Sequence, residues 1–523
     1  MKVIFRVDAS ILIGSGHVMR CLTLADELKR QGYGATFIIR NHHGHLVNMI
    51  EARGYSTVLL PLSEHTLEKR EGDVAHAHWL GVPWEVDVKQ TRQAIGEFKP
   101  DWLVVDHYGI DARWHLAIRD NVKRILVIDD LADRDLNCDL LLDQTYGREL
   151  TDYRNLVPSN CGMLLGSQYA LLQEEFAKLR PMAIVKRKYL NHISKIFLSI
   201  GAIDHDNVTG RILDVLALVE WEKLPFIDVV LGSRAPNLSM VEKQIESHPL
   251  NVSLSVDVSD MAKRMVDADL SIGAGGTTSW ERCCLGLPTI LITIAENQRK
   301  IAEVLDVAGA IYYLGDQSSD FGGELVRSLN LFQDDVNLLK QMSNVCFKVS
   351  DGLGVRRVVV AMSDCEKNEA QNVRLRPLSL ADTELIYGWQ KSERIRRYFN
   401  NPSVPSYDEH VAWIKGRVED VASYTDIIIY QGKPVGVLRL DPADTDIEDL
   451  VAYVVSIYIV EDYQKMGIAS KVLELVNHIM FDRELRAEIH KDNVASQVLF
   501  KRAGFIESDK ADIYYRKAKK FIS

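Results

Sequence analysis

The sequence predicts an α/β protein in which two parallel-sheet domains precede a smaller α+β domain. Short β-branched runs alternate with helical patterns from residue 1 to about residue 170, and the same rhythm restarts at Ile196. This alternation is typical of parallel sheets with crossover helices. After a polar stretch at 364–369, the pattern changes to paired strands that indicate hairpins. We expect domains at 1–180, 190–345 and 372–523, with a linker at 346–371, and 523 residues are enough for three cores.

The composition indicates a globular protein of the cell interior. Hydrophobic residues make up 47% and charged residues 26% of the chain. A net charge of -11 without any block of like charge disfavours a nucleic-acid or membrane partner held by a broad basic surface. The seven cysteines include no CxxC pair, so we expect neither a disulfide framework nor a zinc site. No apolar run approaches ~20 residues, and we therefore expect a cytoplasmic location.

The first domain starts with a strand at 3–7 and a helix that can be read closely. Five apolar residues recur at helical spacing, namely Val18, Cys21, Leu22, Ala25 and Leu28. Gly32 follows as a stop signal, so this helix begins near Gly16. The remaining strands of the domain are expected at 35–40, 102–106, 124–129 and 140–143.

The second domain has strands expected at 196–200, 227–231, 252–256, 268–272 and 289–293. Residues 180–194, between the two domains, are polar and basic without a clear period, and we interpret them as the link. Ligands of open parallel sheets bind beyond the carboxyl ends of the strands. We therefore expect the chemistry to lie in a cleft between these two domains.

A glycine-rich turn with a histidine joins the first strand to its helix, at residues 14–20. Glycine lets the backbone approach a ligand, and free N–H groups at a helix start favour anionic oxygen. The same helix start disfavours imidazolium, so we expect His17 to be neutral at cellular pH and able to take a proton from water. The alternative is that His17 caps the helix or fills a polar corner.

A second glycine-rich turn, at residues 273–281, follows the strand 268–272 of the second domain. Its N–H groups are suited to a pyrophosphate. Thr277 and Glu281 are four residues apart and share one helical face. A carboxylate at Glu281 is suited to accept hydrogen bonds from both hydroxyls of a ribose. The alternative is a tight turn without a ligand.

Taken together, five features resemble the UDP-2,4-diacetamido-2,4,6-trideoxy-β-L-altropyranose hydrolases of the pseudaminic acid pathway over about residues 1–345. They are Asp8, the run 14–20, the pair 129–130, the run 275–281 and the run 296–298. That family is related to glycosyltransferases, so the resemblance implies a GT-B-like pair of Rossmann-type domains.

The resemblance also implies a reaction. His17 is the base that activates water for attack at the anomeric carbon, UDP leaves, the anomeric centre inverts and no metal is needed. Glu281 holds the ribose, and Asn297 lies near the diphosphate or the sugar. The substrate-binding residues expected are Asp8, Gly14, Ser15, Gly16, Arg20, Gly275, Gly276, Thr277, Glu281 and Asn297.

Two positions depart from the family pattern. Gln173 stands where the family has an arginine, so a phosphate contact is lost or is supplied elsewhere, for instance by Arg20. The turn after the strand 196–200 has the single glycine Gly201 where the family has two. The stereochemistry of the sugar is therefore left open.

The C-terminal domain carries a Q-x-x-G-x-A turn between a strand at 452–460 and a helix at 472–480. Consecutive N–H groups at such a turn can bind a pyrophosphate. A strand at 374–377 and a hairpin formed by 427–430 and 434–440 precede it. Together with the ending at 490–505, these features resemble the GNAT acetyltransferases over about 150 residues.

The GNAT resemblance implies acetyl-CoA as cosubstrate, with a splayed strand at 456–460 pairing with the pantetheine arm. The cofactor-binding residues expected are Ile457, Ile459, Gln464, Lys465, Met466, Gly467, Ile468, Ala469 and Asn493. A neutral amine attacks the thioester. A tyrosine often serves as the acid in this family, but here the position holds Phe500; Tyr463, Tyr514 and Ser496 are candidates whose alternative role is packing or surface.

The two resemblances fit consecutive steps on UDP-linked 2,4-diamino sugars, because acetylation of the 4-amino group precedes removal of UDP in that pathway. Residues 396–399 either contact this substrate or form an ordinary helix end, and we favour the helix end. The alternatives for the whole chain are a GT-B glycosyltransferase fused to an acetyltransferase of another amine, such as a protein N-terminus or an antibiotic, and a sugar-nucleotide sensor without catalysis.

Overall fold

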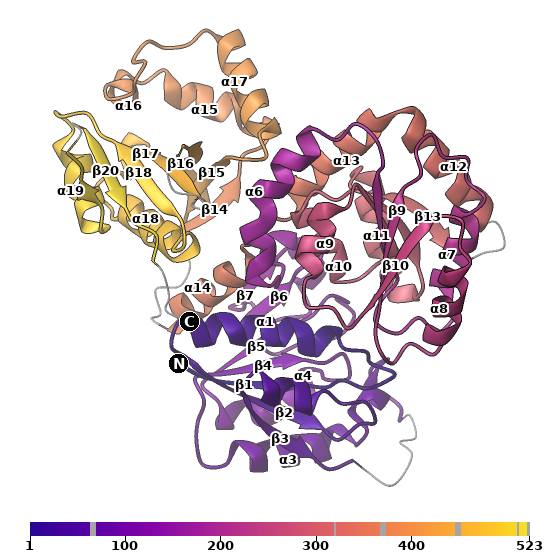
Figure 1. The fold of residues 1–523 in the computed structure, drawn as a ribbon. Coiled ribbons are helices and arrows are strands. Elements are labelled where there is room, and N and C mark those ends of the chain that lie inside the picture. The colour runs from indigo at the N-terminus through magenta and orange to yellow at the C-terminus, as the bar shows by residue number, and fades with distance from the viewer. Residues whose placement is uncertain (63–69, 318–320, 367–372, 445–450, 510–511, 520–523) are drawn as a thin grey trace. The chain divides into compact units, whose positions relative to one another are not determined.

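The computed structural model describes residues 1–62, 70–317, 321–366, 373–444, 451–509 and 512–519. The chain divides into two compact units, Met1–Val359 and Val360–Ser523, and each is described by itself. The first unit contains two parallel sheets with helices on both faces, and the second contains one mixed sheet (Figure 1).

The first sheet of unit 1 has seven parallel strands in the order β3-β2-β1-β4-β5-β6-β7. They are β1 (Lys2–Val7), β2 (Gly34–Arg40), β3 (Ser56–Leu60), β4 (Trp102–Asp106), β5 (Arg124–Ile128), β6 (Leu140–Asp143) and β7 (Gly162–Leu165). The five expected strands are confirmed, and they form the contiguous centre of the sheet. The two edge strands β3 and β7 were not expected, and both are only partly buried.

The helices around this sheet include one that begins where the sequence indicated. Helix α1 (Gly16–Arg30) buries all five residues of the apolar pattern, and Gly32 beyond its end has a φ of +82°. The other helices and 3-10 turns are α2 (Val47–Ala52), η1 (Ala77–Leu80), α3 (Trp84–Ile95), α4 (Ala112–Ile118), η2 (Arg119–Asn121), α5 (Leu150–Tyr153), η3 (Ser167–Tyr169) and α6 (Glu174–Lys188).

The second sheet of unit 1 has six parallel strands in the order β10-β9-β8-β11-β12-β13. They are β8 (Lys195–Ser199), β9 (Phe226–Leu231), β10 (Asn251–Val256), β11 (Leu270–Ala274), β12 (Thr289–Thr293) and β13 (Tyr312–Asp316), of which only β13 was not expected. The accompanying helices are α7 (Val208–Leu216), α8 (Leu238–Glu246), α9 (Met261–Asp267), α10 (Thr278–Cys284), η4 (Glu296–Gln298), α11 (Arg299–Val307), α12 (Phe321–Asp334) and α13 (Val336–Val349).

The segment interpreted as the link between the two sheets is mostly helical, which corrects the sequence interpretation. Residues 180–188 belong to α6, and two of its arginines are buried. Arg180 donates hydrogen bonds to the carbonyls of Cys284 (2.9 Å) and Phe347 (2.8 Å), and Arg187 donates to Met265 (2.8 Å). Because these buried positions are charged, the helix shows no apolar period. The same bonds join α6 to α9, α10 and α13 beside the second sheet, within the one compact unit that holds both sheets.

The expected linker at 346–371 is also largely helical. It contains the end of α13 and most of α14 (Gly354–Glu366), and the boundary between the units falls inside α14. Val358, Val359 and Met362 are fully buried. This stretch is therefore a packed helix and not an extended, exposed linker. Residues 367–371 lie outside the described residues.

Unit 2 has a seven-stranded sheet in the order β14-β15-β16-β17-β18-β20-β19. Its strands are β14 (Val373–Pro377), β15 (Tyr424–Tyr430), β16 (Lys433–Ala443), β17 (Ala452–Ile459), β18 (Glu484–Glu488), β19 (Ile506–Glu507) and β20 (Ile513–Arg516). Its helices are η5 (Leu380–Asp382), α15 (Thr383–Gln390), α16 (Glu393–Arg396), α17 (Tyr407–Glu419), η6 (Glu461–Tyr463), α18 (Ile468–Ile479) and α19 (Val494–Arg502). The predicted hairpin of β15 and β16 is confirmed, with Gln431 and Gly432 both at positive φ in its two-residue turn.

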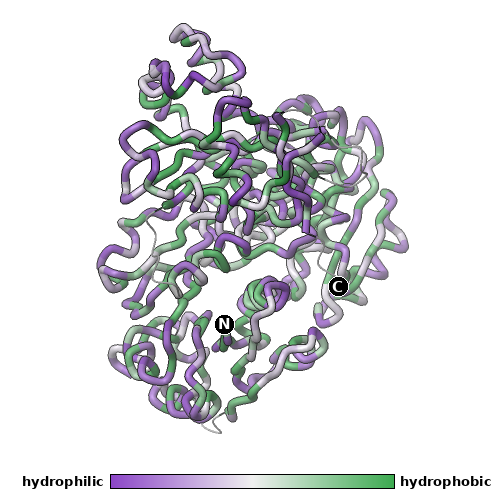
Figure 2. The backbone as a smooth tube through the Cα atoms, turned by 90° about the vertical axis from the view of Figure 1, so that its left-hand side faces the viewer, coloured by the Kyte–Doolittle hydropathy of each residue, from purple (hydrophilic) through white to green (hydrophobic). Residues whose placement is uncertain are grey.

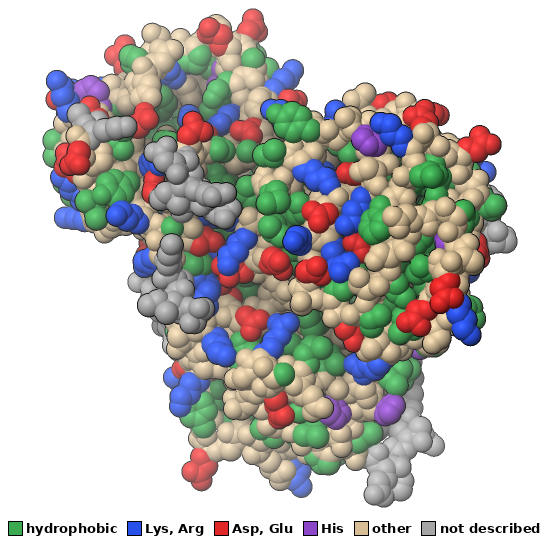
Figure 3. Space-filling model, viewed as in Figure 1, with side chains coloured by type: hydrophobic (Ala, Val, Ile, Leu, Met, Phe, Trp, Pro, Cys, Tyr) green, Lys and Arg blue, Asp and Glu red, His purple; other side chains and the backbone are tan. Residues whose placement is uncertain are grey.

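Hydrophobic and hydrophilic stretches alternate along the backbone (Figure 2), and β4, β11 and β12, in the middle of the two parallel sheets, are buried over their whole length. On the face shown in Figure 3, basic and acidic side chains are interspersed and form no large patch of one sign. Within the described ranges, no helix combines the length and hydrophobicity that crossing a bilayer requires.

Candidate functional sites

The loop between β1 and α1 is shaped by its own backbone. The hydroxyl of Ser10 accepts hydrogen bonds from the N–H groups of Leu12 (3.2 Å) and Ile13 (2.9 Å), and Gly14 has a φ of +80°. Ser15 precedes α1 but its side chain does not cap the helix. The first N–H groups of α1 therefore have no side-chain cap, as expected for an anion-binding helix start.

His17, the predicted base, is held by a carboxylate from another strand. Its Nδ1 lies 2.5 Å from Oδ1 of Asp106, the last residue of β4, and both side chains are buried. An imidazole that donates its Nδ1–H to a carboxylate presents Nε2 as the proton acceptor. The contact therefore orients His17 for general-base chemistry.

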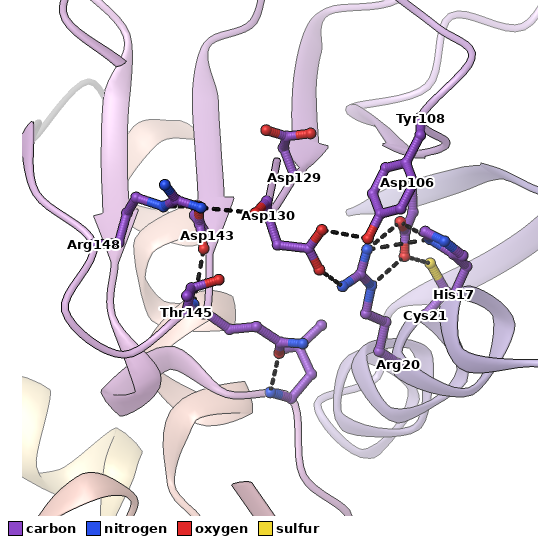
Figure 4. A network of polar contacts seen from close by, with 12 residues as sticks. His17, Arg20, Cys21, Asp106, Tyr108, Asp129, Asp130, Asp143, Thr145 and Arg148 are labelled. Atoms are coloured by element: carbon purple, nitrogen blue, oxygen red, sulfur yellow. Dashed lines mark hydrogen bonds and ion pairs between the residues drawn. The ribbon is translucent and has the colours of Figure 1, made fainter. Parts of the chain in front are cut away.

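Arg20 lies one turn further along α1 and binds two carboxylates within the protein (Figure 4). It donates to Asp106 at 2.6 and 2.7 Å and to Asp130 at 2.9 Å. Burial alone would raise the pKa values of Asp106 and Asp130, but the Arg20 guanidinium holds both below their ordinary range. The Arg20 side chain is 4% exposed and is bound to these two carboxylates. A phosphate contact from Arg20, in place of the arginine missing at Gln173, stays a prediction.

Two rings, Trp79 and Tyr108, lie against His17, and His76 lies against both of them; we name these three residues the ring cluster. Tyr108 stands edge-on to the imidazole at 4.6 Å between ring centroids, and its hydroxyl donates to Asp130. Sequence reasoning missed Asp106 and the ring cluster. A signal existed for Asp106 and Tyr108, because they follow a predicted strand at the carboxyl edge of the sheet.

Asp8, a predicted substrate-binding residue, is held by other residues of the protein. It is fully buried, and Arg6 binds both of its oxygens at 2.7 and 2.9 Å. Its Oδ1 also accepts the backbone N–H of Arg40 at 2.7 Å, and His107 lies 3.3 Å away. Through these bonds Asp8 fixes the ends of β1, β2 and β4, and a direct contact between Asp8 and a substrate stays a prediction.

The turn after β11 is built around close backbone packing. A Cβ on Gly273 would lie 2.2 Å from the guanidinium of Arg282, which donates to the carbonyl of Ala274 at 2.6 Å. Gly276 has a φ of +133°, and Thr277 precedes α10 without a side-chain cap. The expected residues Gly275, Gly276 and Thr277 thus form one turn with uncapped N–H groups.

Glu281 lies on the first turns of α10, half-buried, and no described residue donates a hydrogen bond or an ion pair to its carboxylate. Burial raises the pKa of Glu281 to about 7. A carboxylate held without donors is suited to a ligand that brings hydroxyl groups. The backbone of Asn297 belongs to η4 beside this turn, but its side chain lies outside the described residues.

The carboxyl edges of the two parallel sheets approach each other. A Cβ on Gly44, in the loop after β2, would lie 3.6 Å from Nη1 of Arg234, in the loop after β9. A Cβ on Gly147, after β6, would lie 3.2 Å from the side chain of Val304 on α11. The turns that hold His17 and Glu281 therefore belong to facing edges, as in the predicted arrangement.

In unit 2, β17 separates from β18 as predicted. The two strands pair only over Ala452–Val454, and from Val455 onward β17 pairs with β16 alone. The free edge includes the expected residues Ile457 and Ile459. After the strand, Nε2 of Gln464 donates a hydrogen bond to the carbonyl of Ile459 at 2.9 Å. This bond ties the start of the Q-x-x-G-x-A turn to the end of β17.

The turn before α18 has the conformation of a backbone anion site. Lys465 and Gly467 have φ angles of +63° and +80°, Met466 is exposed, and Gly467 precedes α18 without any side-chain cap. Ile468 and Ala469 begin the helix. Asn493, also expected at the cofactor, caps α19 by accepting the N–H of Ser496 at 3.2 Å.

The next residues to place are those considered for the general acid of the acetyl transfer. Phe500 packs on Phe505, and Tyr514 is 2% exposed in the core. Sequence reasoning missed Tyr458, whose hydroxyl is buried without a hydrogen-bond partner among the described residues. Trp389 and Phe399 flank its ring.

The segment 396–399 is the helix end that we favoured. Arg396 is 6% exposed and donates to the carbonyls of Pro402 (3.2 Å) and Asn401 (2.5 Å). Across the described part of both units, no group of three or more His, Cys, Asp or Glu residues is arranged to hold a metal ion.

Comparisons with known proteins divide the chain as the geometry does. Residues 372–506 match the family described as Acetyltransferase (GNAT) domain. UDP-2,4-diacetamido-2,4,6-trideoxy-beta-L-altropyranose hydrolase of Campylobacter jejuni is 27% identical over 311 residues, which cover 59% of this chain and 97% of the hydrolase. The uncharacterized protein MJ1062 of Methanocaldococcus jannaschii is 21% identical over 98% of both chains.

The crystal structure of Acinetobacter baumannii MurG superposes with a TM-score of 0.51 at 15% identity, covering 70% of this chain and all of MurG. This likeness shows the fold, a GT-B-like pair of Rossmann-type sheets. The chain thus joins a region of about 60% of its length that is similar to a UDP-sugar hydrolase to a C-terminal GNAT acetyltransferase domain, which implies acetyl-CoA binding.

Proposed function

We propose that this protein is a bifunctional cytoplasmic enzyme of pseudaminic acid biosynthesis. Unit 1 hydrolyses UDP-2,4-diacetamido-2,4,6-trideoxy-β-L-altropyranose to UDP and the free sugar. Unit 2 transfers an acetyl group from acetyl-CoA to the 4-amino group of the UDP-sugar precursor. The observation that carries the first activity is the 2.5 Å contact between His17 and Asp106 at an uncapped helix start.

The hydrolysis needs one base and one good leaving group. Asp106 accepts the Nδ1–H of His17, and Nε2 takes a proton from water as the water oxygen forms a bond to the anomeric carbon. The bond between that carbon and the β-phosphate oxygen breaks, and its electron pair leaves with UDP. Because water attacks opposite the leaving group, the anomeric centre inverts.

The UDP group is assigned to the edge of the second sheet. The uncapped N–H groups of the turn Gly275–Thr277 supply donors for the diphosphate. The carboxylate of Glu281, which has no donor among the described residues, accepts hydrogen bonds from the ribose hydroxyls. The position of Asn297 near the diphosphate or the sugar stays a prediction.

The acetyl transfer uses backbone groups more than side chains. Acetyl-CoA supplies an activated thioester. The free edge of β17 supplies N–H and C=O groups for the pantetheine arm, and the turn before α18 supplies N–H groups for the pyrophosphate. The amine nitrogen bonds to the thioester carbonyl carbon, the C–S bond breaks, and the amine loses a proton while coenzyme A leaves. Tyr458, a residue of β17, has a hydroxyl without a hydrogen-bond partner among the described residues.

One experiment tests both activities at once. The protein is incubated with acetyl-CoA and the UDP-linked 4-amino sugar, and coenzyme A, UDP and the free sugar are followed over time. We expect coenzyme A first, then UDP and free sugar in equal amounts. Sugar transferred to an added acceptor instead of water would identify a glycosyltransferase, and acetylation of other amines alone would reassign unit 2.

A further inference from the structure

The ring cluster beside His17 takes no part in the proton transfer described above. Trp79 stacks on Tyr108 at 5.6 Å between centroids with 29° between the ring planes. His76 lies 4.6 Å from Trp79, and the His17 imidazole lies 6.2 Å from Trp79, edge-on. Three rings thus form a wall next to the proposed base.

The short helical turn that carries Trp79 is held in place by the residues it packs against. Trp79 belongs to η1, whose Leu80 is 1% exposed. Gly81 ends this turn with a φ of +69°, and a Cβ there would lie 2.6 Å from Leu62 and 2.8 Å from His42. The turn therefore packs closely against its neighbours, while Trp79 as a residue is only partly buried. Its N–H has no hydrogen-bond partner among the described residues.

The wall is also apolar in character. Burial lowers the pKa of His76, which favours the neutral form of this ring. The Tyr108 hydroxyl is already committed to Asp130. A hydroxyl-rich sugar face on this wall would lose its water without gaining partners, whereas C–H and methyl groups would gain contact area.

We infer that Trp79 binds the apolar face of the glycosyl group and selects sugars that carry methyl groups, namely a 6-deoxy carbon and N-acetyl substituents. This inference rests on the proposed function of unit 1 and deepens it. It makes Trp79 a residue that determines specificity, while His17 and Asp106 carry the chemistry.

The test compares Trp79→Ala and Trp79→Phe with the control Trp84→Phe. Trp84 lies five residues away, stacks on Arg113 and stands outside the ring cluster. KM and kcat of UDP release are measured for the 6-deoxy diacetamido substrate and for UDP-N-acetylglucosamine, and the Kd of UDP alone is measured by calorimetry.

We expect Trp79→Ala to raise KM for the 6-deoxy substrate by about tenfold, to reduce the preference over UDP-N-acetylglucosamine, and to leave the Kd of UDP within about twofold. Trp79→Phe should recover most of the loss, and Trp84→Phe should resemble the wild type. An unchanged KM in Trp79→Ala, or an equal loss for both sugars and for UDP, would overturn the inference.

A binding arm separates this inference from the proposed hydrolysis. The UDP-linked diacetamido sugar is titrated into the wild type and into Trp79→Ala, and its Kd is compared with that of UDP. If the wild type binds the UDP-linked sugar but releases no UDP, the proposed hydrolysis fails. Weaker binding of that sugar to Trp79→Ala would still support the inference that Trp79 binds the glycosyl group. Equal binding to both proteins contradicts it.

Discussion

The two candidate sites both begin at an uncapped helix start, but they hold their reactive groups by different means. At α1, His17 is fixed by a network of side-chain hydrogen bonds that runs from Asp106 through Arg20 to Asp130. At α18, the main features are a free strand edge and a turn with two residues at positive φ. The first site should therefore respond to substitutions of single side chains, and the second to changes of backbone conformation.

The largest effect is expected from removing the base. His17→Ala should lower the rate of UDP release by about 10³-fold, because no other group takes the proton from water. Coenzyme A production should be unchanged, since the acetyl transfer uses unit 2. Both rates are measured in one reaction, and a parallel loss of the two would show that the sites are not independent.

The second site is tested through its turn. Gly467→Asp should lower acetyl transfer more than about 100-fold, because it strains a residue at φ +80° and places a negative charge against a pyrophosphate. UDP release from the diacetylated substrate should persist. Gly416→Asp is the matched control, since Gly416 is exposed on α17 with open space around it. Equal losses in both variants would refute the assignment.

The hydrogen-bond network around His17 is tested by Asp106→Asn. We expect UDP release to fall by about 50-fold, because an amide does not hold His17 in the tautomer that leaves Nε2 free. The Kd of UDP should be unchanged. Asp101→Asn, which affects a surface ion pair with Lys123, is the control. A fall in UDP binding equal to the fall in rate would indicate disordered structure instead of a positioning role.

The role of Glu281 predicts a pH dependence. Because its pKa is raised to about 7, UDP should bind more weakly to the wild type as the pH falls from 8 to 6, by about tenfold relative to Glu281→Gln in the same buffers. A raised pKa in the folded state also means that the wild type loses stability relative to Glu281→Gln as the pH rises from about 4.5 through 7. A pH dependence that survives in the variant would come from another group.

The smallest effect is expected at Tyr458. Tyr458→Phe keeps the ring between Trp389 and Phe399 but removes the hydroxyl, which has no partner in the described part of the chain. If the hydroxyl contacts the amine, KM for the amine should rise by about threefold, with the Kd of coenzyme A unchanged. Improved thermal stability with unchanged kinetics would show that the hydroxyl serves no ligand.

Features of the fold and the sites that depend on local sequence patterns could be predicted, and those that depend on contacts distant in the sequence could not. The central strands and α1 were predictable because their apolar patterns are local. The turns at Gly14, Gly276 and Gly467 were predictable because glycine marks special backbone conformations. Asp106 was missed because its contact with His17 spans 89 positions in the sequence. Helix α6 was misread because Arg180 and Arg187 are buried and bound to carbonyls, so its core face looks polar.

The most direct test of water attack at the anomeric carbon is turnover of the diacetamido UDP-sugar in water enriched in oxygen-18. Breaking the bond between sugar carbon and phosphate oxygen leaves that oxygen on UDP, so the mass of the released UDP should be unchanged. UDP heavier by one oxygen-18 atom would show attack at phosphorus and contradict the role given to His17.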